Sequence, residues 1–172
     1  MQITKPAFIV AELPPDIAAW VRETRLAFEP AISHLPAEIT LTGSSGLGPI
    51  AIGQRVDSVR HMLEVAVVGR IPFEARFTGI GNFPGTDIFF AAPEPGPFIE
   101  LHTAIVNSGI AFERSSFPYC PHCSLKGFTP LRPGQREALN SLSVPASRFT
   151  IRTVSVYEME RMQPNLLFST EG

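Results

Sequence analysis

The sequence predicts an α+β protein with a mostly antiparallel sheet, folded as one domain over residues 1–172. Its segments follow the order strand, helix, strand, helix, hairpin, helix, strand, helix, strand, which indicates this class. A chain of 172 residues that is 44% hydrophobic and 17% charged suits one compact core. Segments 38–43 and 122–127 also share a hydroxyl residue, a leucine and a glycine at equivalent steps, which favours two similar halves.

The first half of the chain is predicted to contain two strands, each followed by a helix. The strand at 3–12 is rich in apolar and β-branched residues and stops at Pro14-Pro15, where a helix can begin. Apolar residues then recur at helical spacing over 16–28 and again over 53–68. Between these two helices, the segment 38–42 alternates as a strand does.

The second half is predicted to begin with a hairpin, in which the loop GIGNFPG joins two strands. A last strand with clean alternation follows two further helices, and the polar tail from about 163 is expected to be loose. The hairpin strands are placed at 73–78 and 87–92, the helices at 98–106 and 133–142, and the last strand at 148–158.

Composition excludes several classes of function. The net charge of −2 argues against an extended nucleic-acid surface, because neutralising many phosphates needs clustered Lys and Arg. The N-terminal residues lack the layout of a secretory signal, and no segment has the roughly 18 apolar residues of a membrane span. We therefore expect a cytoplasmic protein without membrane association. No GxxxxGK[ST] loop is present, so no nucleotide cofactor is expected.

Residues 119–128 (YCPHCSLKGF) hold both cysteines of the chain, with His122 between them. A redox Cys-x-x-Cys normally places its first thiol at a helix N-terminus, where the thiol pKa is lowered. Here the motif is late in the chain and runs into 124–128, which alternates as a strand does. Residues three apart in a strand point to opposite faces, so Cys120 and Cys123 are poorly placed to form a disulfide.

The same stretch also contains part of a possible zinc site. A structural zinc needs four ligands, usually from two paired clusters, and this chain has a single cluster. The other histidines are scattered, and a solvated or packed role is ordinary for them: His34, His61 and His102. We therefore expect no metal.

A third interpretation follows from strand geometry. If 122–126 is extended, His122, Ser124 and Lys126 share one face, and Cys123 lies on the other. An imidazole, a hydroxyl and an ammonium side by side can hold a phosphate and move a proton. The plainer alternative is an edge strand whose polar residues face solvent.

The order and spacing of these segments resemble the two-histidine (2H) phosphoesterase superfamily, which includes 2′-5′ RNA ligase-like proteins and RNA 2′,3′-cyclic phosphodiesterases. That family carries two His-x-Thr/Ser motifs on paired central strands of a bilobal α+β fold with a central cleft. The resemblance covers nearly the whole chain, from FIVAEL and Pro-Pro through FEARFTGIGNFPG to the late Pro-His-x-Ser-Leu. It implies that His122 transfers a proton and that Ser124 and Thr40 bind phosphate oxygens.

The first motif histidine is replaced in this alignment by Glu38. Opening a cyclic phosphate needs one group to activate water and another to protonate the departing ribose oxygen. An ionised Glu38 could act as the base, and an apolar cleft could raise its pKa so that it acts as the acid. His34, four residues upstream, is a further candidate for the missing imidazole.

Three functions follow from the sequence. The first is a metal-independent phosphodiesterase, without cofactor, that acts on 2′,3′-cyclic phosphate RNA ends or small cyclic nucleotides through His122 and Glu38. The second is a non-catalytic module that binds a nucleotide or other anion in the same cleft through Thr40, Ser124 and Lys126. The third is a cytosolic thiol protein that uses the Cys-Pro-His-Cys motif.

Overall fold

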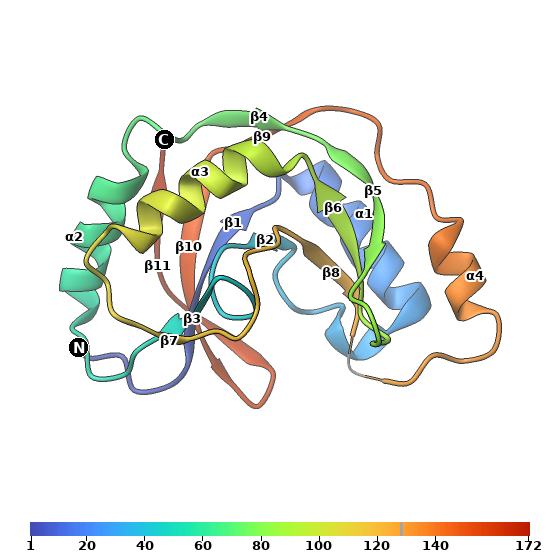
Figure 1. Ribbon diagram of the computed structural model, residues 1–172, viewed down its shortest axis with the longest axis horizontal. Helices are drawn as coiled ribbons and strands as arrows, with labels where there is room; N and C mark the ends of the chain where they lie inside the picture. Colours follow the sequence, from blue (N-terminus) through green and yellow to red (C-terminus); the bar gives the residue numbers. More distant parts are fainter. Residues whose placement is uncertain (128) are drawn as a thin grey trace.

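The computed structural model describes residues 1–127 and 129–172, and they form two lobes (Figure 1). One lobe is built on a sheet whose strand order is β11-β10-β1-β3-β7, with β2 also paired to β1. Every pairing in this sheet is antiparallel: β1 (Ala7–Glu12), β2 (Glu38–Thr40), β3 (Leu47–Ile50), β7 (Phe112–Arg114), β10 (Thr153–Glu160) and β11 (Gln163–Glu171).

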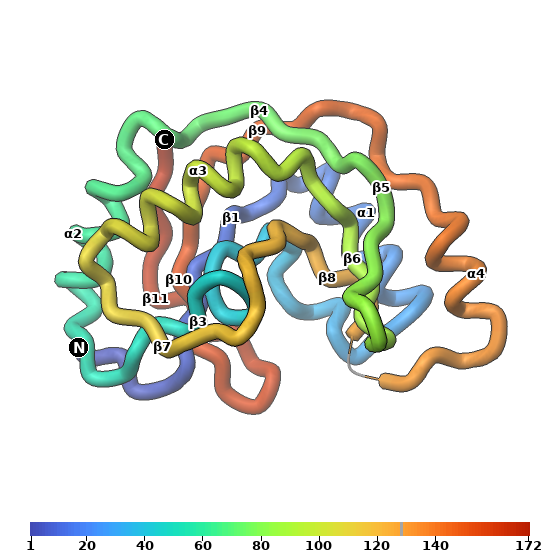
Figure 2. The backbone as a smooth tube through the Cα atoms, in the orientation of Figure 1, coloured from blue at the N-terminus to red at the C-terminus, as the bar shows by residue number. Residues whose placement is uncertain are grey.

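The second lobe contains a three-stranded antiparallel sheet in the order β5-β6-β8, with strands at Phe77–Asn82, Phe89–Pro93 and Cys123–Lys126. Helix α1 (Pro15–Phe28) directly follows β1 of the first sheet but packs against β8 of the second. Figure 2 shows this crossing of the chain from one lobe to the other. The short helices η1 (Pro30–Ile32) and α4 (Gln135–Asn140) lie in the same lobe as α1.

Two helices and a short ribbon complete the molecule. Helix α2 (Val56–Val67) packs against α3 (Pro95–Val106) and against β11. Strand β4 (Phe73–Ala75) pairs with β9 (Phe149–Ile151) in a ribbon that runs between the lobes (Figure 1). None of the helices in the described part of the chain has the length and hydrophobicity that a membrane span requires.

The core of the first lobe follows from strand alternation. In β1, Ala7, Ile9 and Ala11 are fully buried on one face, while Phe8 and Val10 turn to the opposite face. Strand β10 alternates in the same way, with Val154 and Val156 in the core. The faces opposite the core therefore look toward the second lobe, and this arrangement creates the space for a site.

The predicted α+β class with antiparallel sheets is confirmed, and three details of the prediction are wrong. The tail from 163 is not loose, because it pairs with β10 along its length as β11. The hairpin joins β5 to β6, whereas 73–75 pairs with β9, because Arg76 separates two short strands. The last strand is likewise split into β9 and β10 at Arg152. In the strand expected over 124–128, Phe128 lies outside the described residues.

Arg25 of α1 joins the two lobes from inside the protein. The residue is 2% exposed. Its Nε donates to the carbonyl oxygen of Ser124 in β8 at 2.9 Å, and its Nη1 donates to the carbonyl oxygens of Leu35 at 2.9 Å and Pro36 at 3.1 Å. The planar guanidinium thus connects β8 with the segment that leads into β2.

Replacing Arg25 with Met should lower the free energy of unfolding by about 3 kcal/mol, because three buried carbonyl groups lose a charged donor. Urea denaturation would measure this change. The matched control is Arg22→Met on the exposed face of the same helix, which should change stability by no more than about 0.5 kcal/mol. Equal effects of the two substitutions would contradict a joining role for Arg25.

Candidate active site

A cleft of about 380 Å³ lies between the two sheets. Its floor and walls come from residues far apart in the sequence: β1, β2, β10 and β11 of one lobe, and β8 and the β5–β6 turn of the other. Apolar side chains make up most of the lining: Phe8, Val10, Ile32, Leu35, Pro36, Phe83, Ile88, Met159 and Pro164. The polar lining is Arg25, Glu38, Thr40, Thr42, Ser44, His122, Ser124 and Tyr157.

The two segments that share a sequence pattern meet at this cleft. The backbone N–H of Thr40 in β2 donates to the carbonyl oxygen of His122, just before β8, at 3.1 Å. This hydrogen bond connects the two sheets at one point and places Glu38, Thr40, His122 and Ser124 around the same space.

His122 is held in a defined tautomer. The residue is 3% exposed, and its Nδ1 lies 2.7 Å from the carbonyl oxygen of Cys120, so this nitrogen carries the proton. The other nitrogen, Nε2, lies 3.3 Å from Ser44 Oγ in the cleft. The rings of Phe83 and Phe90 meet the imidazole edge-on. Burial lowers the pKa of His122, and the Cys120 carbonyl opposes this shift in part.

Glu38 is half-buried, with one carboxylate oxygen shielded from solvent. Its Oε1 accepts a hydrogen bond from Thr40 Oγ1 at 3.2 Å. Its Oε2 has no hydrogen-bond partner among the described residues. Burial raises the pKa of Glu38 to about 7, against the smaller opposing effects of Arg25 and the Thr40 hydroxyl. The carboxyl group therefore keeps its proton to a higher pH than an exposed glutamate does.

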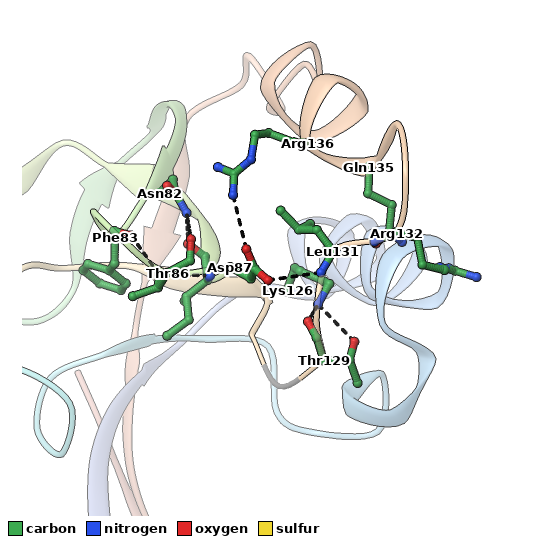
Figure 3. Close-up of polar contacts among 11 residues, drawn as sticks. Asn82, Phe83, Thr86, Asp87, Lys126, Thr129, Leu131, Arg132, Gln135 and Arg136 are labelled. Atoms are coloured by element: carbon green, nitrogen blue, oxygen red, sulfur yellow. Dashed lines mark hydrogen bonds and ion pairs between the residues drawn. The ribbon is translucent and has the colours of Figure 1, made fainter.

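Lys126, predicted to bind substrate, is not among the residues that line the cleft. Figure 3 shows its contact with Thr129. Its side chain is 0% exposed, and Nζ lies 3.5 Å from Glu29 Oε2 and donates to the carbonyl and hydroxyl oxygens of Thr129. The reason is an irregularity in the β6–β8 pairing, where the step from Phe89 to Phe90 spans two residues of β8. Such a bulge breaks the alternation of side chains that the prediction assumed.

The cysteines do not form a redox pair. Both are free thiols, Cys123 is fully buried, and burial raises the pKa of its thiol to about 12. Burial also raises the pKa of Cys120. A reactive thiol needs a lowered pKa, so these shifts do not support the thiol-protein hypothesis. Among residues 1–127 and 129–172, no group of three or more His, Cys, Asp or Glu side chains is placed to hold a metal.

His34 also lies away from the cleft lining. It is exposed, and its Nε2 lies 2.9 Å from the carbonyl oxygen of Met162 in the β10–β11 turn. The structure therefore does not bring this imidazole to the position facing His122.

Sequence patterns did not identify a pair of stacked rings behind β2. His102 and Tyr119 stack at 3.8 Å between ring centroids. His102 Nδ1 donates to the carbonyl oxygen of Leu41 at 2.8 Å, and Tyr119 OH donates to that of Thr40 at 3.1 Å. The carbonyl groups of Thr40 and Leu41 are thus fixed by two side chains that are not part of the cleft lining. Neither residue stands in a recognisable motif, so only the folded chain reveals them.

The β5–β6 turn carries Phe83 and Ile88 into the cleft, and hydrogen bonds fix its shape (Figure 3). Asn82 Nδ2 donates to the carbonyl oxygens of Thr86 and Ile88, and Thr86 Oγ1 donates to that of Phe83. Asp87 ties the turn to the α4 region, accepting from Leu131 N at 3.1 Å and from Arg136 at 3.2 Å. The aromatic wall beside His122 is therefore held in place from both ends.

The fold and the cleft together define a protein of the 2H phosphoesterase type, with two hydroxyl-bearing motif strands around one central space. The chain belongs to the 2′-5′ RNA ligase superfamily, whose sequence profile matches residues 13–163. This membership confirms the resemblance on which the sequence-based expectation rested.

Solved structures agree with this fold. A phosphoesterase crystal structure matches with a TM-score of 0.59 at 17% identity, covering 97% of both chains. E. coli LigT complexed with 3′-AMP matches with a TM-score of 0.58 at 17% identity, again covering 97% of both. E. coli LigT complexed with NADP+ gives 0.60 at 15% identity, covering 98% of both. No curated protein sequence matches this chain.

Lys126→Met should lower the free energy of unfolding by about 3 kcal/mol, because removing one partner from a buried ion pair leaves the Glu29 charge less compensated. The control is Arg136→Met, whose ion pair with Asp87 is partly exposed and should contribute no more than about 1 kcal/mol. Urea denaturation of both variants measures the difference. An undiminished stability of Lys126→Met would show that the buried pair is not needed.

Glu38→Gln should stabilise the protein at alkaline pH. Because the folded-state pKa of about 7 exceeds the unfolded value near 4.3, the stability supplied by this group falls as the pH rises between them. The amide has no such dependence, so the gain from Glu38→Gln at pH 8 should exceed the gain at pH 5 by about 2 kcal/mol. Chemical denaturation at both pH values, beside the exposed Glu23→Gln, tests this; a gain independent of pH contradicts it.

Proposed function

We propose that this protein is a metal-independent phosphodiesterase that opens 2′,3′-cyclic phosphates of RNA ends or small cyclic nucleotides. In this proposal Glu38 takes the place of the first motif histidine. The observation that carries it is the pairing of two titratable groups, His122 and Glu38, around one cleft, where burial raises the pKa of Glu38 to about 7 and lowers the pKa of His122. Ring opening needs both an acid and a base in protonation states that coexist at working pH.

The geometry of His122 favours the role of base. Because Nδ1 donates a hydrogen bond to the carbonyl oxygen of Cys120, the lone pair of Nε2 is directed to the cleft, where Ser44 Oγ lies. Burial keeps the ring neutral at pH 7 by lowering its pKa. A water molecule beside Nε2 could lose its proton to the imidazole as it attacks phosphorus.

Glu38 then supplies the proton that the leaving ribose oxygen requires. An ordinary glutamate is ionised at pH 7 and cannot do this, whereas a carboxyl group with a pKa near 7 is a competent acid. Its protonated form would also remove a negative charge from the path of the phosphate. Thr40 and Ser124 both line the cleft, and in this proposal Ser124, and Thr40 once its hydroxyl leaves Glu38, donate hydrogen bonds to phosphate oxygens.

The relatives support a ligand of this class. E. coli LigT has been solved with 3′-AMP, ATP and phosphate, so that protein accepts small nucleotide and phosphate ligands. We extend this class of ligand to the cleft of the present chain.

The test is hydrolysis, with EDTA present, of a short RNA that ends in a 2′,3′-cyclic phosphate. Wild type should open the ring, and His122→Ala and Glu38→Ala should each reduce kcat by about 10²–10⁴-fold. Activity should fall above pH 7 as Glu38 loses its proton, and at acidic pH as His122 gains one. His34→Ala is the control and should retain full activity.

The variant Glu38→His separates an active enzyme from one that has lost its chemistry. It restores the motif of the family and should also be active. If Glu38→His opens the ring and wild type does not, Glu38 does not act as the acid, and the cleft of the natural chain would be a binding site for nucleotides or other anions.

A further inference from the structure

The cleft contains few charges. Among its described lining residues, the ionisable groups are Arg25, Glu38, His122 and Tyr157. Arg25 supplies the one permanent positive charge, and its guanidinium already donates to three backbone carbonyls. Lys126, which sequence alternation places here, is instead paired with Glu29 behind the sheet. An anion bound in the cleft would therefore contact hydroxyl groups and an imidazole, and the guanidinium of Arg25 would be the single fixed positive charge behind them.

The charge on Glu38 determines the net charge of the cleft. With His122 neutral, an ionised Glu38 cancels Arg25 and leaves no net charge for an anion, whereas a protonated Glu38 leaves one positive charge. The groups that face Glu38 from the surrounding elements are Arg25 of α1, Glu12 of β1, Tyr119 and Cys123 near β8, and Tyr157 of β10. Glu12 is opposite Glu38 in the sheet but accepts hydrogen bonds from Ser155 and Tyr157.

The apolar walls of the cleft strengthen the interactions between these charges. Phe8, Phe83, Ile88 and Met159 exclude water from much of the surface, and Glu38 Oε2 is buried without a hydrogen-bond partner in the described chain. Charges interact more strongly where water is excluded, so a second negative charge on the ligand is poorly compensated here. One phosphate charge against one guanidinium is the balanced state.

We propose that the cleft selects ligands with a single negative charge, such as a cyclic phosphodiester on a nucleoside, over phosphate monoesters, and that Glu38 takes up a proton when the anion binds. This inference rests on the proposed function for the identity of the site and specifies its ligand class. A glutamate rather than a histidine at position 38 then has a consequence for binding. The ring-opened product, a dianionic monoester above its second pKa near 6, would be bound less tightly than the substrate.

The test compares two ligands that differ by one charge, adenosine 2′,3′-cyclic phosphate and adenosine 3′-phosphate, by isothermal titration calorimetry at pH 8. The cyclic ester should bind at least about tenfold more tightly, and the ratio should shrink at pH 5.5, where the monoester carries one charge. Equal affinity of the two ligands at pH 8, or no binding of either, would overturn the inference.

Proton uptake gives a second readout. Affinity of wild type for the cyclic ester should fall about tenfold between pH 6 and pH 8, and titrations in two buffers of different ionisation enthalpy should report about one proton taken up at pH 8. Glu38→Gln should abolish both effects while still binding, and the exposed Glu23→Gln should leave both unchanged. A pH-independent affinity in wild type would contradict a protonated Glu38 in the complex.

Binding and turnover are measured separately, which keeps this inference distinct from the proposed function. Chromatography of the ligand after each titration reports hydrolysis, and His122→Ala carries the binding measurement if the cyclic ester is consumed. Hydrolysis without charge selection would overturn the inference alone. Charge selection without hydrolysis would overturn the proposed enzyme and leave the ligand class standing.

Discussion

The buried guanidinium of Arg25 is the contact on which the arrangement of the cleft depends, because it joins the segments that carry both motifs. Helix α1 leaves the first sheet and packs on the second, and Arg25 then hydrogen-bonds to backbone oxygens of β8 and of the segment before β2. A side chain that is buried and charged must have its donors satisfied, so this geometry is closely specified. The two strands that face each other across the site are held by the same group.

Three further sets of contacts hold the rest of the site in place. The hydrogen bond from Thr40 N to His122 O connects the motif strands directly, and the stacked pair of His102 and Tyr119 fixes the carbonyls at the end of β2. In the second lobe, the hydrogen-bonded β5–β6 turn holds Phe83 in edge-on contact with His122. These contacts exclude water from the two titratable groups, and that exclusion raises the pKa of Glu38 to about 7 and lowers the pKa of His122.

In the proposed function, this arrangement allows the carboxyl group of Glu38 to act where the family pattern has an imidazole. The chemistry needs a group that holds a proton near pH 7, and burial gives Glu38 that property without a change in the fold. It also changes the charge of the cleft, since an imidazole and a carboxyl group differ by one unit in each protonation state. A substitution at one position therefore bears on proton transfer and on ligand charge together.

The sequence by itself determined the α+β class, the superfamily and the presence of His122, Ser124, Thr40 and Glu38 as candidate residues, because period-two alternation and short motifs are local properties of the chain. Tertiary structure alone decided which of them share a space. The bulge that turns Lys126 toward Glu29, the pairing of the tail as β11 and the crossing of α1 all depend on contacts between residues distant in sequence. The raised pKa of Glu38 was also decided by the tertiary structure, because a pKa follows from the surroundings that folding creates.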